Sequence, residues 1–354
     1  MTTRTRYFVI VSLLVLGVGV GTGLLAYYVG TGAPSGRGGP DELRFVPGNA
    51  TLVAYANVQE VMTSSLRGKL REALPVKPEG QRELQNETGI NIETDIDRVL
   101  ACIAPPVDAT SRPPATGLVL ARGRFDQVKI EALMREHGAV AEDYRGARLI
   151  IAPAGSGGGQ TGSPDGVRQH GALSVAFIEP GLVGLGSTPL VRHAIDLKAA
   201  GDTATANQDN ITANQKMMDL VKSIESGNVW AVGRFDALTS QARLPGDLAG
   251  RLPPITWFSA SGRVDGGLSG VLQAETHDDE SAANLRDVTR GLLALAKMQA
   301  GSRPEMLALV QSLQLGGTGK TVTMSFDVPA GVFDLLGPAL NRGRQNLPPL
   351  SPGK

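Results

Sequence analysis

Cysteine is almost absent from this chain of 354 residues, since Cys102 is the only one. A single cysteine cannot form an internal disulfide or a cysteine-rich metal site. Histidine is nearly as scarce, and the four residues His137, His170, His193 and His277 show none of the paired spacings that zinc ligands have. We therefore expect no metal centre.

An excess of charge of either sign is also lacking. Lys plus Arg and Asp plus Glu both number 34, so no bulk field attracts a polyanion and we expect no nucleic acid partner. Aromatic residues make up only 4%, whereas 45 Gly and 22 Pro indicate many turns. The 42% of hydrophobic residues can form the core of one large domain or two ordinary ones.

Two glycine-rich runs imitate nucleotide motifs but lack their defining residues. GGTGKT at residues 316–321 would need a glycine at position 314, where Gln314 stands, and the following TVTMSFDV alternates like a strand. We predict a β-hairpin there and no nucleotide. In GLGSTP at residues 184–189, Pro189 replaces the third glycine of a dinucleotide fingerprint, which predicts a helix start capped by Ser187 or Thr188.

Common catalytic signatures are missing as well. No G-x-S-x-G elbow occurs, and the only S-x-x-K, at residues 351–354, ends the chain in a loose tail. The acidic residues beside His277 begin a predicted helix, where its dipole favours them without a metal. We expect no catalytic residues and no cofactor, although a dispersed triad that uses His193 or His277 stays open.

The strongest positive signal is at the N-terminus. Residues 7–30 carry no charge and follow Arg4 and Arg6; as a helix they would span about 36 Å, enough for a bilayer core of about 30 Å. The positive-inside rule then places the N-terminus in the cytoplasm and the rest outside. A cleaved signal peptide is the alternative, but its apolar region is normally shorter and ends in a small-residue site.

Glycines recur within this predicted transmembrane helix. Gly17, Gly19, Gly21 and Gly23 form two overlapping G-x-x-x-G pairs. Such pairs let two helices approach closely and form a homodimer. Glycine is also simply common in membrane helices, so both interpretations stay open.

The remaining chain divides by composition. Residues 1–6 form a cytoplasmic end, 31–42 a flexible linker, and 341–354 a disordered tail. Polar or Pro/Gly-rich stretches interrupt the body at residues 104–116, 153–171 and 201–213.

Short β-rich runs alternate with helical patterns in the body. We predict strands near residues 51–58, 99–104, 117–125, 147–152, 172–179, 182–186, 228–235, 255–264, 268–276, 310–316 and 320–328. We predict helices near residues 59–73, 126–137, 189–199, 213–226, 236–250, 278–300 and 330–339.

This order predicts an α+β fold with an internal repeat. Residues 43–200 and 201–340 each read as a β-α-β-β-α-β-like half, with mainly antiparallel sheet and helices packed on one face. Residues 119–128, VLARGRFDQV, also share six of ten positions with residues 229–238, VWAVGRFDAL. The two matches imply different offsets, so the register of the repeat stays open.

The shared GRFD has a structural and a functional interpretation. Structurally, the glycines permit close approach, Phe125 and Phe235 fill the core, and Asp126 and Asp236 cap helices. Functionally, Arg124, Arg234 and Arg263, the last from the partial copy ASGRVD, would line a shared anion-binding site. The structural interpretation accounts for more of the residues in the motif.

The runs FVPGNATLVAYANVQEVM and GLVLARGRFDQVKIEALM, together with the anchor, resemble uncharacterised bacterial envelope proteins that have an N-terminal anchor and a duplicated α+β exported region. The resemblance implies no catalytic residues. We expect a single-pass membrane protein that binds or scaffolds an envelope partner and is not an enzyme. The alternatives are an envelope hydrolase with a dispersed site and a carrier of an apolar ligand.

Overall fold

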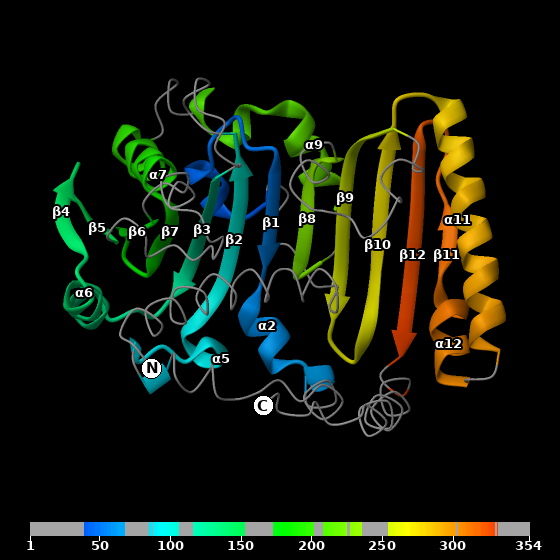
Figure 1. The fold of residues 1–354 in the computed structure, drawn as a ribbon, viewed down its shortest axis with the longest axis horizontal. Helices are drawn as coiled ribbons and strands as arrows, with labels where there is room; N and C mark the ends of the chain where they lie inside the picture. Colours follow the sequence, from blue (N-terminus) through cyan, green and yellow to red (C-terminus); the bar gives the residue numbers. More distant parts are fainter. Residues whose placement is uncertain are drawn as a thin grey trace, which may run out of the picture.

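The computed structural model (Figure 1) describes residues 39–67, 85–86, 88–105, 116–152, 173–201, 208–224, 227–235, 254–301, 304–329 and 331. The predicted transmembrane helix at 7–30 lies outside these ranges, as do the loop at 153–171, the helix at 236–250 and the tail at 341–354. Of the helix predicted at 330–339, only residue 331 is described. Within the described ranges, no helix is both long and apolar enough to cross a membrane.

The described strands form one twelve-stranded sheet with the order β11-β12-β10-β9-β8-β1-β2-β3-β7-β6-β5-β4. Every neighbouring pair is antiparallel, which confirms the mixed α+β class and the antiparallel sheet. The strands are β1 (Leu52–Ala56), β2 (Ile96–Ala104), β3 (Thr116–Gly123), β4 (Val140–Tyr144), β5 (Ala147–Ile151), β6 (Leu173–Glu179), β7 (Leu182–Ser187), β8 (Val229–Arg234), β9 (Ile255–Val264), β10 (Gly267–Thr276), β11 (Gln314–Gly316) and β12 (Thr321–Pro329). The helices are η1 (Asp41–Phe45), α2 (Val58–Thr63), α5 (Ile92–Asp95), α6 (Gln127–Glu136), α7 (Thr188–Ala200), η3 (Ile211–Ala213), α9 (Gln215–Ser223), α11 (Asp279–Ala300) and α12 (Pro304–Ser312).

Strands β1 and β8 lie side by side in the interior of the sheet, with Ala54 opposite Ala231. From each of them the chain adds two strands outward, β2 and β3 on one side and β9 and β10 on the other. It then passes through helix α6, or through α11 and α12, to the outer edge and returns, so that β7 pairs with β3 and β12 with β10 (Figure 1). The sheet is therefore continuous across residue 200.

The described strands do not pair as a split β-α-β unit requires. In such a unit, strands joined through a helix are parallel. Here α2 and α5 join β1 to β2, and these two strands are adjacent and antiparallel. The predicted β-α-β-β-α-β element order is thus close to that of the first half, and its strands pair antiparallel as predicted.

Helices cover both faces of the sheet, whereas we predicted one. Alternate side chains of a strand point to opposite faces. Leu100 and Cys102 of β2 pack in the main core with α7 and α9, while Val99 packs in a second cluster with Val58 of α2 and Ile130 of α6. The reason is that β2 and β3 are apolar on both faces, which requires cover on both.

Helix α12 and strand β4 differ from the sequence prediction because tertiary contacts decide them. Part of the predicted strand at 310–316 belongs to α12, where Leu309 packs against Val328 and Phe326 of β12. Strand β4, which the sequence analysis missed, reads VAEDY and lacks an apolar run. It is an edge strand, and such strands need little apolar surface.

The hairpin predicted at GGTGKT is confirmed. Strands β11 and β12 pair with Gly316 opposite Thr323. Gly317 has φ +97°, and a Cβ there would overlap the carbonyl oxygen of Thr321. Arg286 of α11 donates to the carbonyl oxygens of Gly319 and Thr321, at 2.7 and 2.9 Å. A phosphate-binding loop would instead direct its N–H groups at a ligand.

Candidate functional site

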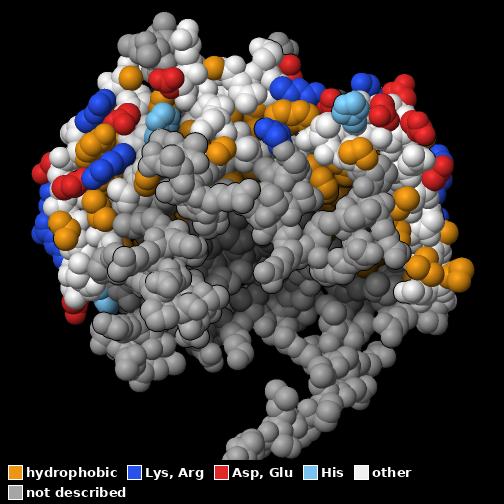
Figure 2. Space-filling view, turned by 45° about the horizontal axis from the view of Figure 1, so that its top comes forward, with side chains coloured by type: hydrophobic (Ala, Val, Ile, Leu, Met, Phe, Trp, Pro, Cys, Tyr) orange, Lys and Arg blue, Asp and Glu red, His pale blue; other side chains and the backbone are white. Residues whose placement is uncertain are grey.

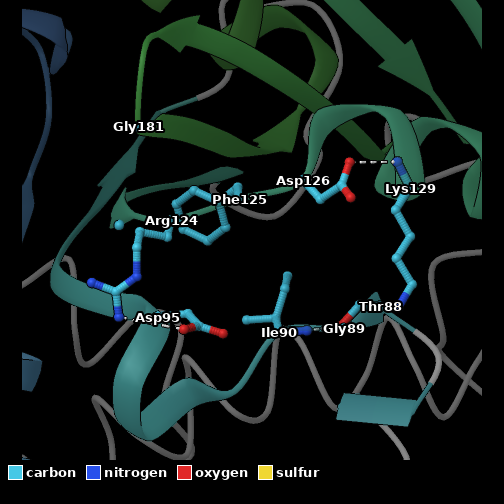
Figure 3. Close-up of a pocket in the computed structure, with 10 residues that line it drawn as sticks. Thr88, Gly89, Ile90, Asp95, Arg124, Phe125, Asp126, Lys129 and Gly181 are labelled. Atoms are coloured by element: carbon cyan, nitrogen blue, oxygen red, sulfur yellow. Dashed lines mark hydrogen bonds and ion pairs between the residues drawn. The ribbon is translucent and has the colours of Figure 1, made fainter.

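A cleft of about 540 Å³ opens where β3 meets α6 (Figure 3). This volume is in the range of small-molecule sites. Three segments of chain converge on it: residues 88–95, which end with α5, the β3–α6 junction and the β6–β7 turn. We call it the GRFD cleft; its lining is Thr88, Gly89, Ile90, Asp95, Gly123, Arg124, Phe125, Asp126, Lys129 and Gly181.

The structural roles predicted for the first GRFD are confirmed. A Cβ on Gly123 would overlap the carbonyl oxygen of Asp95, so only glycine fits at this strand end. Phe125 packs against two of the hydrophobic clusters. Asp126 caps α6 by accepting a hydrogen bond from the backbone N–H of Lys129 at 3.0 Å. In the second GRFD, Phe235 packs edge-on against Phe258, and Asp236 lies outside the described residues.

Arg124 is tied to one wall of the GRFD cleft. Its backbone N–H donates to the carbonyl oxygen of Asp95 at 2.7 Å, and its guanidinium donates to the carbonyl oxygen of Thr94 and to Asp95 Oδ1. The backbone hydrogen bond from Asn91 lowers the pKa of Asp95, and Thr94 and Arg124 lower it further although burial opposes them. Asp95 therefore stays ionised and its oxygens are already engaged.

Lys129 supplies the other cation of the GRFD cleft. Its ammonium lies over Gly89, where an added Cβ would sit 2.6 Å from Nζ. The structure gives this ammonium no hydrogen bond or ion pair with another described residue, and Figure 3 shows the side chain reaching from α6 toward Thr88 and Gly89. Asp95 and Asp126 each already accept a hydrogen bond from a nearby backbone N–H. Lys129 is therefore the charged group best placed to bind an anionic ligand.

The three arginines considered for a shared anion site do not lie together. Arg124 is beside Asp95 at the start of β2, while the backbone N–H of Arg234 bonds to Thr51, at the opposite end of the strands. Arg263 lies on β9, which β2, β1 and β8 separate from β3. The similar sequences therefore lie at different places in the sheet, because GRFD ends the third strand of one half and the first strand of the other.

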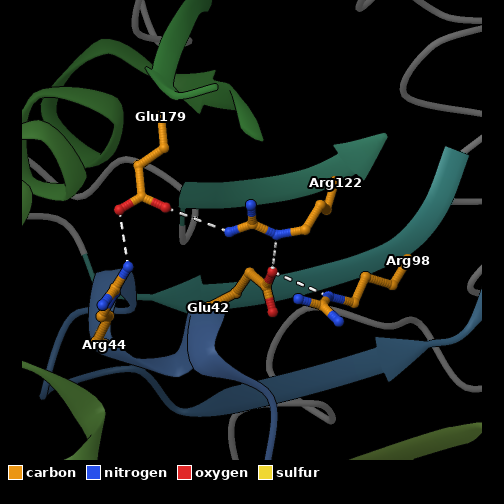
Figure 4. A network of polar contacts seen from close by, with 5 residues as sticks. All are labelled: Glu42, Arg44, Arg98, Arg122 and Glu179. Carbon is orange, nitrogen blue, oxygen red and sulfur yellow. Dashed lines mark hydrogen bonds and ion pairs between the residues drawn. The ribbon is translucent and has the colours of Figure 1, made fainter. Parts of the chain in front are cut away.

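Figure 4 shows a second polar cluster, which consists of Glu42, Arg44, Arg98, Arg122 and Glu179. Glu42 is 1% exposed and accepts hydrogen bonds from Arg98 Nε at 3.0 Å and from Arg122 Nε. Arg98 and Arg122 face each other across β2 and β3. Glu42 pairs with both of these like charges and Glu179 also pairs with Arg122, at 3.3 Å, so we assign the cluster a structural role.

The histidines considered for a dispersed triad have few polar neighbours among the described residues. His277 Nδ1 is 3.5 Å from Asp278, which caps α11 by accepting from the N–H of Ser281, and no hydrogen bond joins His277 to a serine among the described residues. His193 Nε2 is buried without a hydrogen-bond partner. Over the described part of the chain, no three His, Cys, Asp or Glu side chains group as metal ligands would.

Most of the cleft lining could not be predicted from the sequence. The repeated motif indicates Arg124 and Asp126 but not Lys129, although Lys129 is one turn into the helix that Asp126 caps. Thr88, Gly89 and Gly181 come from other segments and carry no motif. Only the fold brings them to the GRFD loop.

Comparisons with known proteins identify no family. No protein-family model matches the sequence, and no curated protein matches it. One solved structure with some similarity is crystal form I of TP0453, with 10% sequence identity and a TM-score of 0.41 over 85% of this chain and 98% of that one. Similarity at this level carries no argument about function.

Proposed function

We propose that this chain is a non-catalytic binding module of the cell envelope, held at a membrane by residues 7–30, whose body recognises a small anionic molecule in the GRFD cleft. The ligand proposal rests on one observation: Lys129 and Arg124 line one cleft whose acids are already hydrogen-bonded. The membrane part rests on the uncharged N-terminal segment and the arginines before it.

The cleft also favours a ligand with an apolar part. Phe125 and Ile90 line it beside the two cations. An aromatic or aliphatic group would pack on these side chains while its anionic group meets Lys129. The mixed lining suits this ligand better than the wholly apolar one that the carrier alternative requires.

The hydrolase alternative would need a histidine within hydrogen-bond reach of a serine and an acid. His277 has the acid Asp278 beside it, but no hydrogen bond joins it to a described serine, and it is 76% exposed. The geometry therefore favours binding over hydrolysis for the described part of the chain.

We also propose that the body consists of two related halves that meet at β1 and β8. The support is topological, because each half adds two strands outward and then returns from the outer edge to its third strand. In this register Gly48-Asn49 before β1 corresponds to Gly227-Asn228 before β8. The two GRFD runs then lie at non-equivalent strands.

Titration of the full chain in detergent tests the ligand proposal. Phenyl phosphate, inorganic phosphate and choline serve as probes, with binding measured by calorimetry. We expect phenyl phosphate to bind and choline not to bind. Lys129→Ala should weaken binding about tenfold to a hundredfold, the value of one charge-assisted hydrogen bond.

Lys222→Ala is the matched control, since Lys222 is an exposed lysine on α9, away from the cleft. It should leave the affinity unchanged. Equal affinity in the wild type and Lys129→Ala, or preferential binding of choline, would contradict an anionic ligand in the GRFD cleft.

A further inference from the structure

Helix α11 exposes a row of large hydrophobic side chains that its own sheet leaves uncovered. Val288 is 40% exposed, Leu292 55% and Leu295 49%, and we call these three residues the α11 stripe. Near the start of the helix, Ala282 and Leu285 pack in a cluster with Val322 of β12, and Ala300 at its end is buried. Figure 2 shows acidic side chains near the top of the right-hand edge, where α11 lies, and hydrophobic ones below them.

The spacing of the stripe is that of a helix-pairing seam. Val288, Leu292 and Leu295 recur at intervals of four and three residues, which is the spacing of one heptad of a coiled coil. Charged residues stay off the seam and are engaged within the chain. Arg290 pairs with Asp287 at 2.7 Å, and Arg286 donates to the β11–β12 turn.

Charge favours an antiparallel partner. Asp278, Asp279 and Glu280 stand at the start of α11 and Lys297 near its end. A parallel copy would place the two acidic ends together, whereas an antiparallel copy separates them and aligns the helix dipoles favourably.

The α11 stripe is also self-complementary in shape. Leu292 projects from the helix, while a Cβ on the neighbouring Gly291 would meet nothing within 4 Å. A two-fold axis between these two residues places Leu292 of each copy over the notch at Gly291 of the other, and Val288 opposite Leu295. In such an isologous contact, the same surface of each copy packs against the other copy.

We propose that the α11 stripe is a homodimer interface, in which α11 packs antiparallel against α11 of a second copy. The contact spans about two turns of helix per copy. It is small for an obligate dimer, so the dimer is reversible. Copies that share one membrane would meet at high effective concentration, which compensates for a small interface.

Site-directed cross-linking of the full chain tests the interface. Leu292→Cys is treated in membranes with a bismaleimide whose spacer is about 8 Å, close to the separation of packed helices. The native chain adds no competing thiol, because Cys102 is its only cysteine and is buried. We expect a cross-linked species of twice the mass.

Ala283→Cys is the matched control, since residue 283 is exposed on the side of α11 opposite Leu292. It should give no cross-linked dimer. Equal yields from the two cysteines would show association through another part of the chain, such as the N-terminal helix, and would overturn the proposal. Absence of a cross-linked dimer of Leu292→Cys would also overturn the proposal. It would indicate that the membrane or another segment of this chain covers the α11 stripe.

A charge on the stripe provides a second measurement. Leu292→Glu should raise the dimer Kd at least about tenfold in sedimentation equilibrium in detergent, because a leucine contact is lost and two like charges meet. Ala283→Glu should leave the Kd unchanged. Because both sites are exposed, both variants should keep the wild-type circular dichroism spectrum; an unchanged Kd in Leu292→Glu would overturn the proposal.

Discussion

Glu42 carries a charge into the interior of the protein, where Arg98 and Arg122 compensate it. Burial alone would raise its pKa, but the hydrogen bond from Arg122 and the charges of both arginines lower the pKa below its usual value of 4.5. A pKa that is lower in the folded state means that the carboxylate stabilises the fold above its unfolded pKa. This contribution is lost as the pH falls through the folded value.

Glu42→Gln should therefore destabilise the protein at pH 7. We expect a loss of about 3 kcal/mol in the free energy of unfolding, because the buried carboxylate between Arg98 and Arg122 is lost and Glu179 is left as the counter-charge of Arg122. The difference from wild type should shrink at pH values well below 4.5, where the wild-type carboxyl becomes protonated. Urea unfolding followed by tryptophan fluorescence at both pH values measures this.

Glu142→Gln is the control for the Glu42 prediction. Glu142 pairs with Arg192 at 2.7 Å, but both side chains are about 40% exposed, so its loss should cost less than about 1 kcal/mol. Equal losses in the two variants would contradict the structural role of the buried cluster. This cluster could not be predicted from the sequence, because Glu42 and Arg122 are separated by 80 positions.

At the scale of elements, local sequence was informative wherever a turn or cap decides the structure. The β11–β12 hairpin follows from its glycines and from the alternating residues after them. The cap of α6 follows from Asp126 directly before an apolar helix pattern. Strand β4 and helix α12 were not found, because neighbours from elsewhere in the chain specify them.

Gly317→Ala should destabilise the hairpin by about 1–3 kcal/mol, because the residue has a positive φ and its Cβ would overlap Thr321. Thermal unfolding of the full chain measures the effect. Gly266→Ala is the control, since a Cβ there meets nothing within 4 Å and its φ is not positive. A loss as large in the control, or none in Gly317→Ala, would show that the turn geometry does not require glycine.

At the scale of the whole molecule, the proposal that the body lies outside the membrane is testable through cysteine chemistry. Burial raises the pKa of Cys102 to about 12, so the wild-type chain should not react with a maleimide at neutral pH. Val140→Cys adds a thiol at a residue that is 67% exposed on the edge strand β4. In intact cells, a membrane-impermeant maleimide should label this variant.

Thr3→Cys, in the predicted cytoplasmic end, is the matched control and should react only after lysis. Labelling of Val140→Cys only after lysis would place the body on the cytoplasmic side and contradict the proposed topology. The wild-type chain reports any background from Cys102.

The sequence by itself determined the α+β class, most strands, the hairpin at GGTGKT and the local role of GRFD at the end of β3, because these depend on residues close together in the chain. Only the tertiary structure decided that the sheet is single, that helices cover both faces, and that Lys129 and Gly89 share a cleft with Arg124. Those features depend on which strands become neighbours. Many packing contacts between distant segments determine this together, and no single stretch of residues records it.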